Sequence, residues 1–244
     1  MSDRFQPVVL CYHAISDTWE QLLSVRPFAF ERQLRLMLAR GYMAASAAEV
    51  AGGRGRLFHV TFDDALRSVV NALPILERHR VSATVFACTD YARNGDVFAV
   101  PELAPEASAH PHELATMDWD ALAELSGRGV EIGSHTKTHP HLRGLSDVEL
   151  RAELVESREQ LEDVLGGPCR FLAFPFGEHD ARVRAAARAS GYEAAFALPG
   201  RSKPWDVFAI PRVGMWRHTT LVQAAVKTSS LSSAVAVAAR RSRR

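Results

Sequence analysis

Cysteine is scarce in this chain of 244 residues. Cys11, Cys88 and Cys169 are the only three, and they are too scattered for a disulfide framework or a Cys-x-x-Cys zinc site. Each lies in an apolar run typical of a strand, so we expect small buried hydrophobes. Cys11 lies two residues before His13, but no nearby group would orient a thiol–imidazole pair for nucleophilic catalysis.

An excess of charge of one sign is also lacking. The chain has 29 Lys and Arg against 28 Asp and Glu, a net charge of +1, so the electrostatic footprint of a nucleic-acid-binding protein is missing. No apolar run approaches the ~20 residues that cross a bilayer, and the run at 8–10 is too brief for a signal-peptide core. We therefore expect a cytoplasmic protein without a transmembrane segment.

The last residues, 240–244, read Arg-Arg-Ser-Arg-Arg. A solvated basic end is the main interpretation, and peripheral contact with an anionic membrane is the weaker alternative. We assign residues 1–220 to one domain and residues 221–244 to a C-terminal helix and basic tail.

Short apolar or β-branched runs alternate with helical patterns along the chain. This βαβα alternation predicts an α/β fold with a parallel sheet. The length suits a single-domain, distorted (β/α)7 barrel, although an open doubly wound sheet fits the same pattern. The expected strands cover residues 7–12, 57–62, 83–88, 130–133, 170–174, 194–197 and 208–213.

The helical segments carry fewer signals. A helix from Val69 to Leu76 is expected to kink at Pro74, and Ser146 with Glu149 forms a capping box before another helix. Residues 90–115 lack periodicity. A loop of this length in a compact domain is usually functional or mobile.

Thr61-Phe62-Asp63-Asp64 places two adjacent carboxylates at the end of an expected strand. Acidic groups at the edge of an apolar core are costly unless they are neutralised, and a bound cation is the simplest remedy. One carboxylate would then hold the metal while the other faces a water molecule. An exposed helix N-cap is the alternative for this segment taken alone.

A second polar segment, from Gly133 to Leu142, also follows an expected strand and contains three histidines. His135 and His139 are four residues apart, so one helical turn would bring both rings to the same side. His141 is a rival ligand that the spacing alone does not exclude.

Two imidazoles and one carboxylate are the ligand set of a catalytic zinc-type site. Zinc is the default metal, and nickel, cobalt or iron would suit the same ligands. A structural zinc site would need a fourth ligand, usually a thiolate, and no cysteine adjoins these segments. Non-haem iron oxygenases use similar ligands but usually place the carboxylate in a His-x-Asp pair, whereas here it comes some seventy residues before the histidines.

Three motifs of the chain resemble those of one known family. They are Thr61-Phe62-Asp63-Asp64, Ser134-His135-Thr136-Lys137-Thr138-His139-Pro140 and Phe174-Pro175-Phe176-Gly177. In order and spacing they are similar to the first motifs of the polysaccharide deacetylases (the NodB-like deacetylases). The resemblance covers roughly residues 7–215. A further resemblance is carried by Val9-Leu10-Cys11-Tyr12-His13, Phe28, Phe30 and Gly41-Tyr42. These residues are similar to the corresponding pattern of one branch of the family, the poly-N-acetylglucosamine deacetylases.

The resemblance implies a role for each of these residues. It implies that Asp63 is the general base and that Asp64, His135 and His139 bind the metal. It further implies that the turn Pro175-Phe176-Gly177 holds the oxyanion through the Phe176 N–H. No Leu-x-His segment supplies the usual C-terminal acid, so the resemblance implies that His13 is the general acid.

The sequence departs from the family pattern at two positions. The glycine that usually follows Asp-Asp is Ala65, and the arginine that often precedes Pro-aromatic-Gly is replaced by Ala173. Arg212, in the last expected strand, is our candidate for orienting Asp63. Arg170 is a weaker alternative, and a surface ion pair is the other interpretation of Arg212.

The predicted function is metal-dependent hydrolysis of N-acetyl groups on an amino-sugar substrate. An O-acetyl carbohydrate esterase with the same residues and a non-catalytic carbohydrate-binding protein are the alternatives. An acid at His13 favours amide cleavage, since an amine is the poorer leaving group. Candidate platforms for stacking sugar rings are Phe176, Trp119, Trp205 and Trp216.

Overall fold

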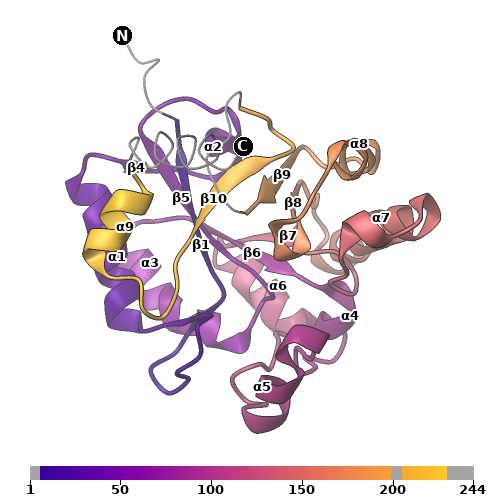
Figure 1. Ribbon diagram of the computed structural model, residues 1–244, viewed down its shortest axis with the longest axis horizontal. Helices are drawn as coiled ribbons and strands as arrows, with labels where there is room; N and C mark the ends of the chain where they lie inside the picture. The colour runs from indigo at the N-terminus through magenta and orange to yellow at the C-terminus, as the bar shows by residue number, and fades with distance from the viewer. Residues whose placement is uncertain (1–5, 199–204, 230–244) are drawn as a thin grey trace, which may run out of the picture.

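The computed structural model describes residues 6–198 and 205–229. Seven of the described strands form a parallel sheet that closes on itself (Figure 1). The order around the ring is β1-β10-β9-β8-β7-β6-β5, and β5 pairs back to β1. The predicted distorted (β/α)7 barrel is confirmed. The seven strands are β1 Val8–Tyr12, β5 Leu57–Phe62, β6 Ala83–Ala87, β7 Glu131–Ser134, β8 Phe171–Ala173, β9 Ala194–Ala197 and β10 Ile210–Gly214.

The pairing of β1 with β5 rules out an open doubly wound sheet. It runs in continuous parallel register from Val8 opposite Phe58 to Tyr12 opposite Phe62. Three further strands stand outside the ring. A short β4 (Met43–Ala44) pairs in parallel with β5. The strands β2 (Ala14–Ile15) and β3 (Ser24–Val25) form a small parallel pair of their own.

Helices cover the outside of the barrel (Figure 1). Strands buried on both faces explain the continuous apolar runs in the sequence. The helices are α1 Pro27–Ala39, α2 Ala47–Ala51, α3 Leu73–His79, α4 Thr89–Ala92, α5 Ala104–Ala109, α6 Trp119–Gly127, α7 Asp147–Leu165, α8 Ala181–Ala189 and α9 Leu221–Lys227. Short 3₁₀ helices lie at Arg67–Ala72, Pro101–Leu103, Leu142–Gly144 and Pro175–Gly177.

Alternation along the strands separates two apolar layers. On β1, Leu10 and Tyr12 pack in the layer between sheet and helices, whereas Val9 belongs to the barrel interior. Because successive strand residues point to opposite faces, residues 9, 11 and 13 share the inner face. The interior cluster includes Val9, Phe86, Phe171, Ala173, Ala194, Phe196 and Ile210.

Two predictions about helices are wrong. Residues 67–72 form a 3₁₀ helix, and α3 begins at Leu73 with Pro74 in its first turn; there the missing N–H of proline costs no hydrogen bond, so Pro74 starts a helix instead of kinking one. Residues 90–115 contain α5 and parts of other short helices. Helices of four to six residues are too short to show helical periodicity.

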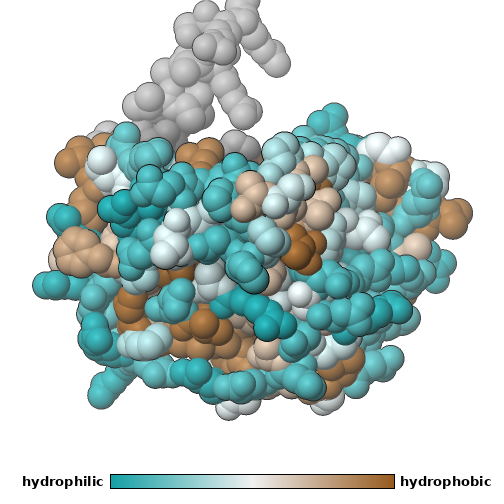
Figure 2. Space-filling view, turned by 90° about the horizontal axis from the view of Figure 1, so that it is seen from below, coloured by the Kyte–Doolittle hydropathy of each residue, from teal (hydrophilic) through white to brown (hydrophobic). Residues whose placement is uncertain are grey.

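Helix α9 packs against α1 at the end of the described chain. Arg40 Nη1 donates to the carbonyl of Ala225 over 2.9 Å and to the hydroxyl of Thr228 over 2.7 Å. The predicted basic end, 240–244, lies outside the described residues. Within 6–198 and 205–229, no helix has the length and apolar character needed to span a membrane. The surface seen from below is mostly hydrophilic, with apolar side chains gathered in a hollowed patch (Figure 2).

His59 is a buried histidine of the barrel interior and is 1% exposed. Its Nδ1 donates to the carbonyl of Ala45 over 2.7 Å, and its Nε2 accepts from the hydroxyl of Thr84 over 2.9 Å. Burial lowers the pKa of His59 to about 4, although the Ala45 hydrogen bond opposes this shift. The neutral ring is therefore the form that the fold accommodates.

We predict that His59 makes the protein sensitive to acid. The unfolded chain binds this proton near pH 6.5 and the folded chain only near pH 4, so stability is complete above pH 6.5 and is lost as the pH falls toward 4. A shift of this size corresponds to roughly 3 kcal/mol. Chemical denaturation of wild type and His59→Gln between pH 8 and 4 measures it. Parallel pH profiles for the two proteins would contradict the prediction.

Candidate metal centre and active site

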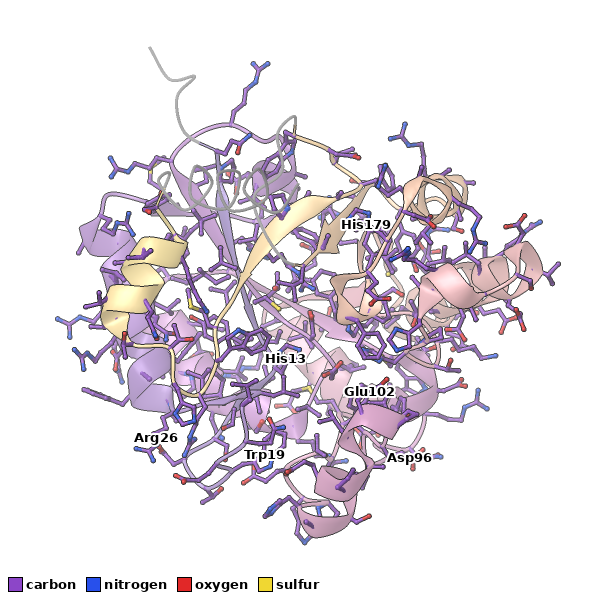
Figure 3. The ribbon with its side chains drawn as sticks, viewed as in Figure 1. His13, Trp19, Arg26, Asp96, Glu102 and His179 are labelled. Atoms are coloured by element: carbon purple, nitrogen blue, oxygen red, sulfur yellow. The ribbon has the colours of Figure 1, made fainter. Side chains whose placement is uncertain are left out.

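The functional side chains gather at one rim of the barrel because all its strands run parallel and their C-terminal ends meet there. His13 follows β1, Asp63 follows β5 and His135 follows β7. Figure 3 shows His13 toward the middle of the molecule, with Glu102 beside it in the view. The strand-end placement predicted for these residues is thus the one observed.

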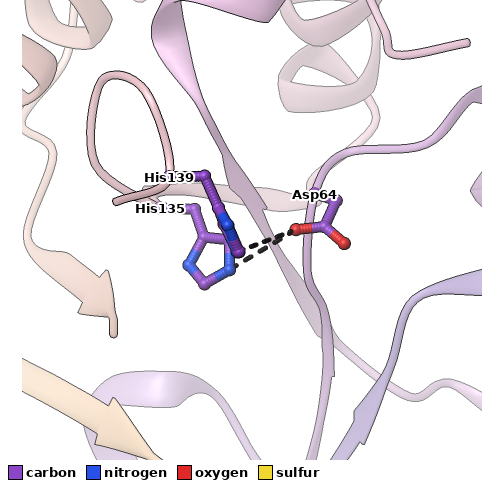
Figure 4. A group of neighbouring side chains, drawn as sticks. All are labelled: Asp64, His135 and His139. Atoms are coloured by element: carbon purple, nitrogen blue, oxygen red, sulfur yellow. Dashed lines mark ion pairs between the residues drawn. The ribbon is translucent and has the colours of Figure 1, made fainter. Parts of the chain in front are cut away.

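Asp64, His135 and His139 form one compact cluster (Figure 4). Asp64 Oδ1 lies 3.5 Å from His135 Nε2 and 3.6 Å from His139 Nε2, and the three donor atoms lie within 4.8 Å of one another. Two ligand atoms of a tetrahedral zinc ion with bonds of ~2.0–2.1 Å are about 3.3 Å apart. The spacing therefore suits a single divalent cation.

The hydrogen bonds and the protonation of the cluster also suit a bound cation. His135 Nδ1 donates to the carbonyl of Ala173 over 2.8 Å, which leaves the lone pair of Nε2 toward Asp64. Asp64 is 3% exposed, and its Oδ1 is a buried oxygen without a hydrogen-bond partner. Burial, together with the charge of Asp63, raises the pKa of Asp64. A buried carboxylate that lacks a proton donor fits a cation.

The local backbone corrects one expectation. His135 and His139 are not brought together by a helical turn, since residues 135–141 form an irregular loop with bends at 137 and 138. Thr136 and His139 adopt left-handed conformations with φ of 69° and 63°. The hydroxyl of Ser134 accepts from the N–H of Thr136 over 3.1 Å, and the hydroxyl of Thr136 accepts from the N–H of His139 over 3.2 Å.

Glu153 of α7 anchors the loop that carries His135 and His139. This role was not predicted from the sequence. Its carboxylate accepts from the backbone N–H groups of Lys137 and Thr138 over 2.9 and 3.0 Å. The hydroxyl of Thr138 donates to it as well, over 2.7 Å. A glutamate in the middle of a charged helix carries no sequence signal for this contact.

His141, the rival ligand, lies outside the metal cluster. Its Nε2 pairs with Glu102 over 3.1 Å and its Nδ1 with Glu178 over 3.2 Å. Hydrogen bonds to Glu102 and Glu178 raise the pKa of His141. The ring stacks on Phe176 with centroids 4.0 Å apart. Both nitrogens are therefore engaged by carboxylates.

Asp63 is held by a buried bidentate ion pair with Arg212. Nη1 and Nη2 of Arg212 donate to Oδ1 and Oδ2 over 2.6 and 2.8 Å, and the Cys11 thiol donates to Oδ2 over 3.5 Å. Burial acts to raise the pKa of Asp63, but the charges of Arg212 and His135 outweigh it and hold this pKa well below its usual range. Arg170, the weaker alternative, pairs instead with Glu131 over 2.9 Å.

His13 lines the pocket that also contains Asp63 and the metal cluster, and it is partly exposed there. Its Nδ1 is buried and has no hydrogen-bond partner, and its ring centroid lies 5.5 Å from that of Trp216. Burial lowers the pKa of His13 to about 4, with Asp63 opposing the shift. The imidazole is therefore neutral at pH 7 before substrate binds.

The turn after β8 contributes Phe176 and Gly177 to the wall of the pocket. Phe176 has φ of 57° and is the second residue of the 3₁₀ helix Pro175–Gly177, so its N–H has no partner within that turn. Gly177 has φ of 68°, and a Cβ there would lie 2.4 Å from the backbone nitrogen of Leu198. The close approach of Leu198 explains why glycine is needed at this position.

The pocket around these groups measures about 270 Å³. Two loops that the motifs did not mark supply its apolar walls, one after β2 and one within residues 90–115. Of the expected stacking residues, Phe176 lines the pocket and Trp216 lies against His13. Trp119 packs against the core, and Trp205 donates to the carbonyl of Ala51. The residues of these two loops that line the pocket are Gln21, Leu22, Leu23, Phe98, Val100, Glu102 and Leu103.

Ala65, in the place of the expected glycine, keeps the turn. Asp64 and Ala65 have φ of 65° and 47°, conformations that cost a non-glycine residue roughly 1–2 kcal/mol. The carbonyl of Ala65 accepts from the N–H of Met117 over 2.8 Å. The small side chain is buried at 1% exposure, so the departure from glycine leaves the carboxylates in position.

A parallel barrel with carboxylates and imidazoles at the C-terminal ends of its strands is typical of α/β-barrel enzymes, which carry their active sites at this rim. A family model described as polysaccharide deacetylase matches residues 52–195. The chain belongs to the polysaccharide deacetylase family, which confirms the family predicted from the motifs. The matched segment contains Asp63, Asp64, His135 and His139, whereas Arg212 lies beyond it.

Known proteins agree with this assignment. A polysaccharide deacetylase from Bacillus cereus has a TM-score of 0.73 at 26% identity, over 92% of this chain and 69% of that one. IcaB from Ammonifex degensii has a TM-score of 0.76 at 20% identity, over 93% and 99% of the two chains, a likeness of fold. A peptidoglycan-N-acetylglucosamine deacetylase of Bacillus cereus is 26% identical over 121 residues, 49% of this chain and 36% of that one.

We predict that the cluster binds one divalent cation per chain. Purified protein loaded with Zn²⁺ and desalted should keep one equivalent, measured by elemental analysis. Asp64→Asn and His139→Gln should weaken binding by at least about tenfold, the loss that even supporting groups cause. His141→Gln is the matched control and should retain the metal. Equal loss in all three variants would contradict the assignment.

Proposed function

We propose that this protein is a metal-dependent deacetylase that hydrolyses N-linked acetyl groups of amino sugars in a glycan or glycoconjugate. The observation that carries the proposal is the Asp64, His135 and His139 cluster beside the ion-paired carboxylate of Asp63. Zinc is the metal we expect, and nickel, cobalt or iron would suit the same donors. The similarity to a peptidoglycan-N-acetylglucosamine deacetylase supports an N-acetylated amino sugar as substrate.

A divalent cation, when bound, would polarise the acetyl carbonyl and lower the pKa of water. Asp63 is ionised and its carboxylate Oδ2 lies 4.0 Å from His135 Nε2, so it is beside the ligand cluster. In the proposed reaction Asp63 accepts a proton from the attacking water. Arg212 keeps both carboxylate oxygens in fixed positions, which maintains the alignment needed for that transfer.

The tetrahedral adduct carries negative charge on the former acetyl oxygen. The N–H of Phe176 is proposed to donate to this oxygen. In the proposed step His13 takes up the proton that Asp63 accepted from the water. A nearby negative charge raises a histidine pKa, so His13 becomes the stronger base as the adduct forms, while the low pKa of Asp63 favours release of that proton. His13 then delivers a proton to the nitrogen, the C–N bond breaks, and acetate and a free amine are the products.

We predict that Asp63 is required for turnover while metal binding persists without it. Asp63→Asn should lower kcat/KM for acetate release from N-acetylglucosamine oligomers by about 10²–10⁴-fold, the usual contribution of a general base. Metal content, measured on the same samples, should stay at one equivalent. Equal acetate release by wild type and variant would show that Asp63 is not the base.

Loss of His13 should distinguish amide from ester cleavage. An alkoxide leaves more readily than an amine, so His13→Gln should lower kcat/KM by about 10²-fold or more on an N-acetylated sugar. On an O-acetylated sugar the same variant should lose less than about tenfold. Paired acetate-release assays measure both ratios. A wild-type enzyme that cleaves only the O-acetyl substrate would refute the N-deacetylase proposal.

A further inference from the structure

An apolar groove adjoins the catalytic pocket. Leu22 lines both the pocket and this groove, which measures about 400 Å³. The far wall is α9, whose Val222 and Val226 are 75% and 58% exposed, and Leu22 itself is 53% exposed. Single exposed apolar residues are ordinary, but a set that lines one hollow indicates a binding surface.

Trp216 joins the groove to the reaction centre. Its indole lines the groove, and its ring centroid lies 5.5 Å from that of His13. The ring covers Gly214 at the end of β10, where a Cβ would come within 2.5 Å of the Trp216 Cζ2 atom. A substrate atom that leaves the pocket past His13 therefore meets an aromatic face.

Arg217 fixes the segment that carries Trp216 to the loop that carries Leu22. Its backbone N–H donates to the carbonyl of Leu22 over 2.9 Å. Its guanidinium donates to the carbonyl of Ser16 over 3.0 Å and pairs with Glu20 over 2.8 Å. The groove is preformed, which is usual for small-molecule sites.

Four polar side chains line the groove besides Trp216, and all but His218 are directed to the protein's own backbone. Thr219 Oγ1 accepts from the N–H of Trp216, and Gln223 Oε1 accepts from the N–H of Thr220, each over 2.9 Å. Lys227 Nζ donates to the carbonyl of Gly214 over 2.9 Å. Among residues 6–198 and 205–229, no carboxylate lines the groove. A further sugar ring would find few partners for its hydroxyls here, whereas an alkyl chain needs none.

We infer that this groove binds an apolar aglycone, an alkyl or acyl chain attached to the acetylated amino sugar. The inference rests on the proposed function, because it places the sugar in the catalytic pocket. Its chain would then pass Leu22 and Trp216 and lie along the exposed valines of α9. The substrate class assigned in this way is an amphiphilic glycoconjugate.

The test compares the methyl and decyl glycosides of one N-acetylglucosamine oligomer, below the critical micelle concentration of the decyl compound. Wild type should show at least a tenfold higher kcat/KM for the decyl glycoside. Val222→Asp and Val226→Asp should bring this ratio close to one. Val148→Asp is the matched control, since Val148 is 80% exposed on α7, and it should keep the wild-type ratio. A ratio of two substrates on one preparation cancels any loss of folded protein.

Binding of both glycosides to metal-free protein, followed by tryptophan fluorescence, separates this inference from the proposed function. Tighter binding of the decyl glycoside that Val222→Asp abolishes supports the groove, even if no acetate is released and the proposed function fails. Equal binding and equal kcat/KM for the two glycosides overturn the inference and leave the deacetylase intact. A decyl preference that survives Val222→Asp, or that arises only above the micellar concentration, also overturns it.

Discussion

The architecture of the rim depends on the charge of two adjacent buried carboxylates. Asp63 and Asp64 are 2% and 3% exposed, and like charges this close destabilise each other. Arg212 neutralises Asp63 through two short hydrogen bonds, whereas Asp64 faces only the imidazoles of His135 and His139. Asp63 is thereby kept ionised, whereas Asp64 forms part of a cluster that could hold a cation.

Closure of the barrel makes this division of roles feasible. Strand β1 lies between β5 and β10, with Val9 opposite Arg212 on one side and Cys11 opposite Thr61 on the other. Parallel registers on both sides of β1 bring Arg212 of β10 to Asp63, the residue that follows β5. His13 directly follows β1, so the ion pair and the proposed acid depend on one set of hydrogen-bonded pairs.

Much of this could be predicted from sequence, because strand ends of a parallel barrel share a rim. Residue type and position predicted a metal site of one carboxylate and two imidazoles, and the resemblance to the polysaccharide deacetylases singled out Asp64, His135 and His139. The sequence could not give the left-handed turn at Thr136 and His139, since the same spacing also suits a helix. Nor could it reveal the pocket walls or the groove, whose residues come from loops and from α9 and meet only through tertiary packing.

The most direct test is anomalous X-ray diffraction from crystals soaked in Zn²⁺. The account predicts one strong peak about 2.0–2.2 Å from Asp64 Oδ1, His135 Nε2 and His139 Nε2. The Arg212 pair with Asp63 should remain intact in the same crystals. A peak between His141 and Glu102 instead, with nothing at Asp64, would contradict the account.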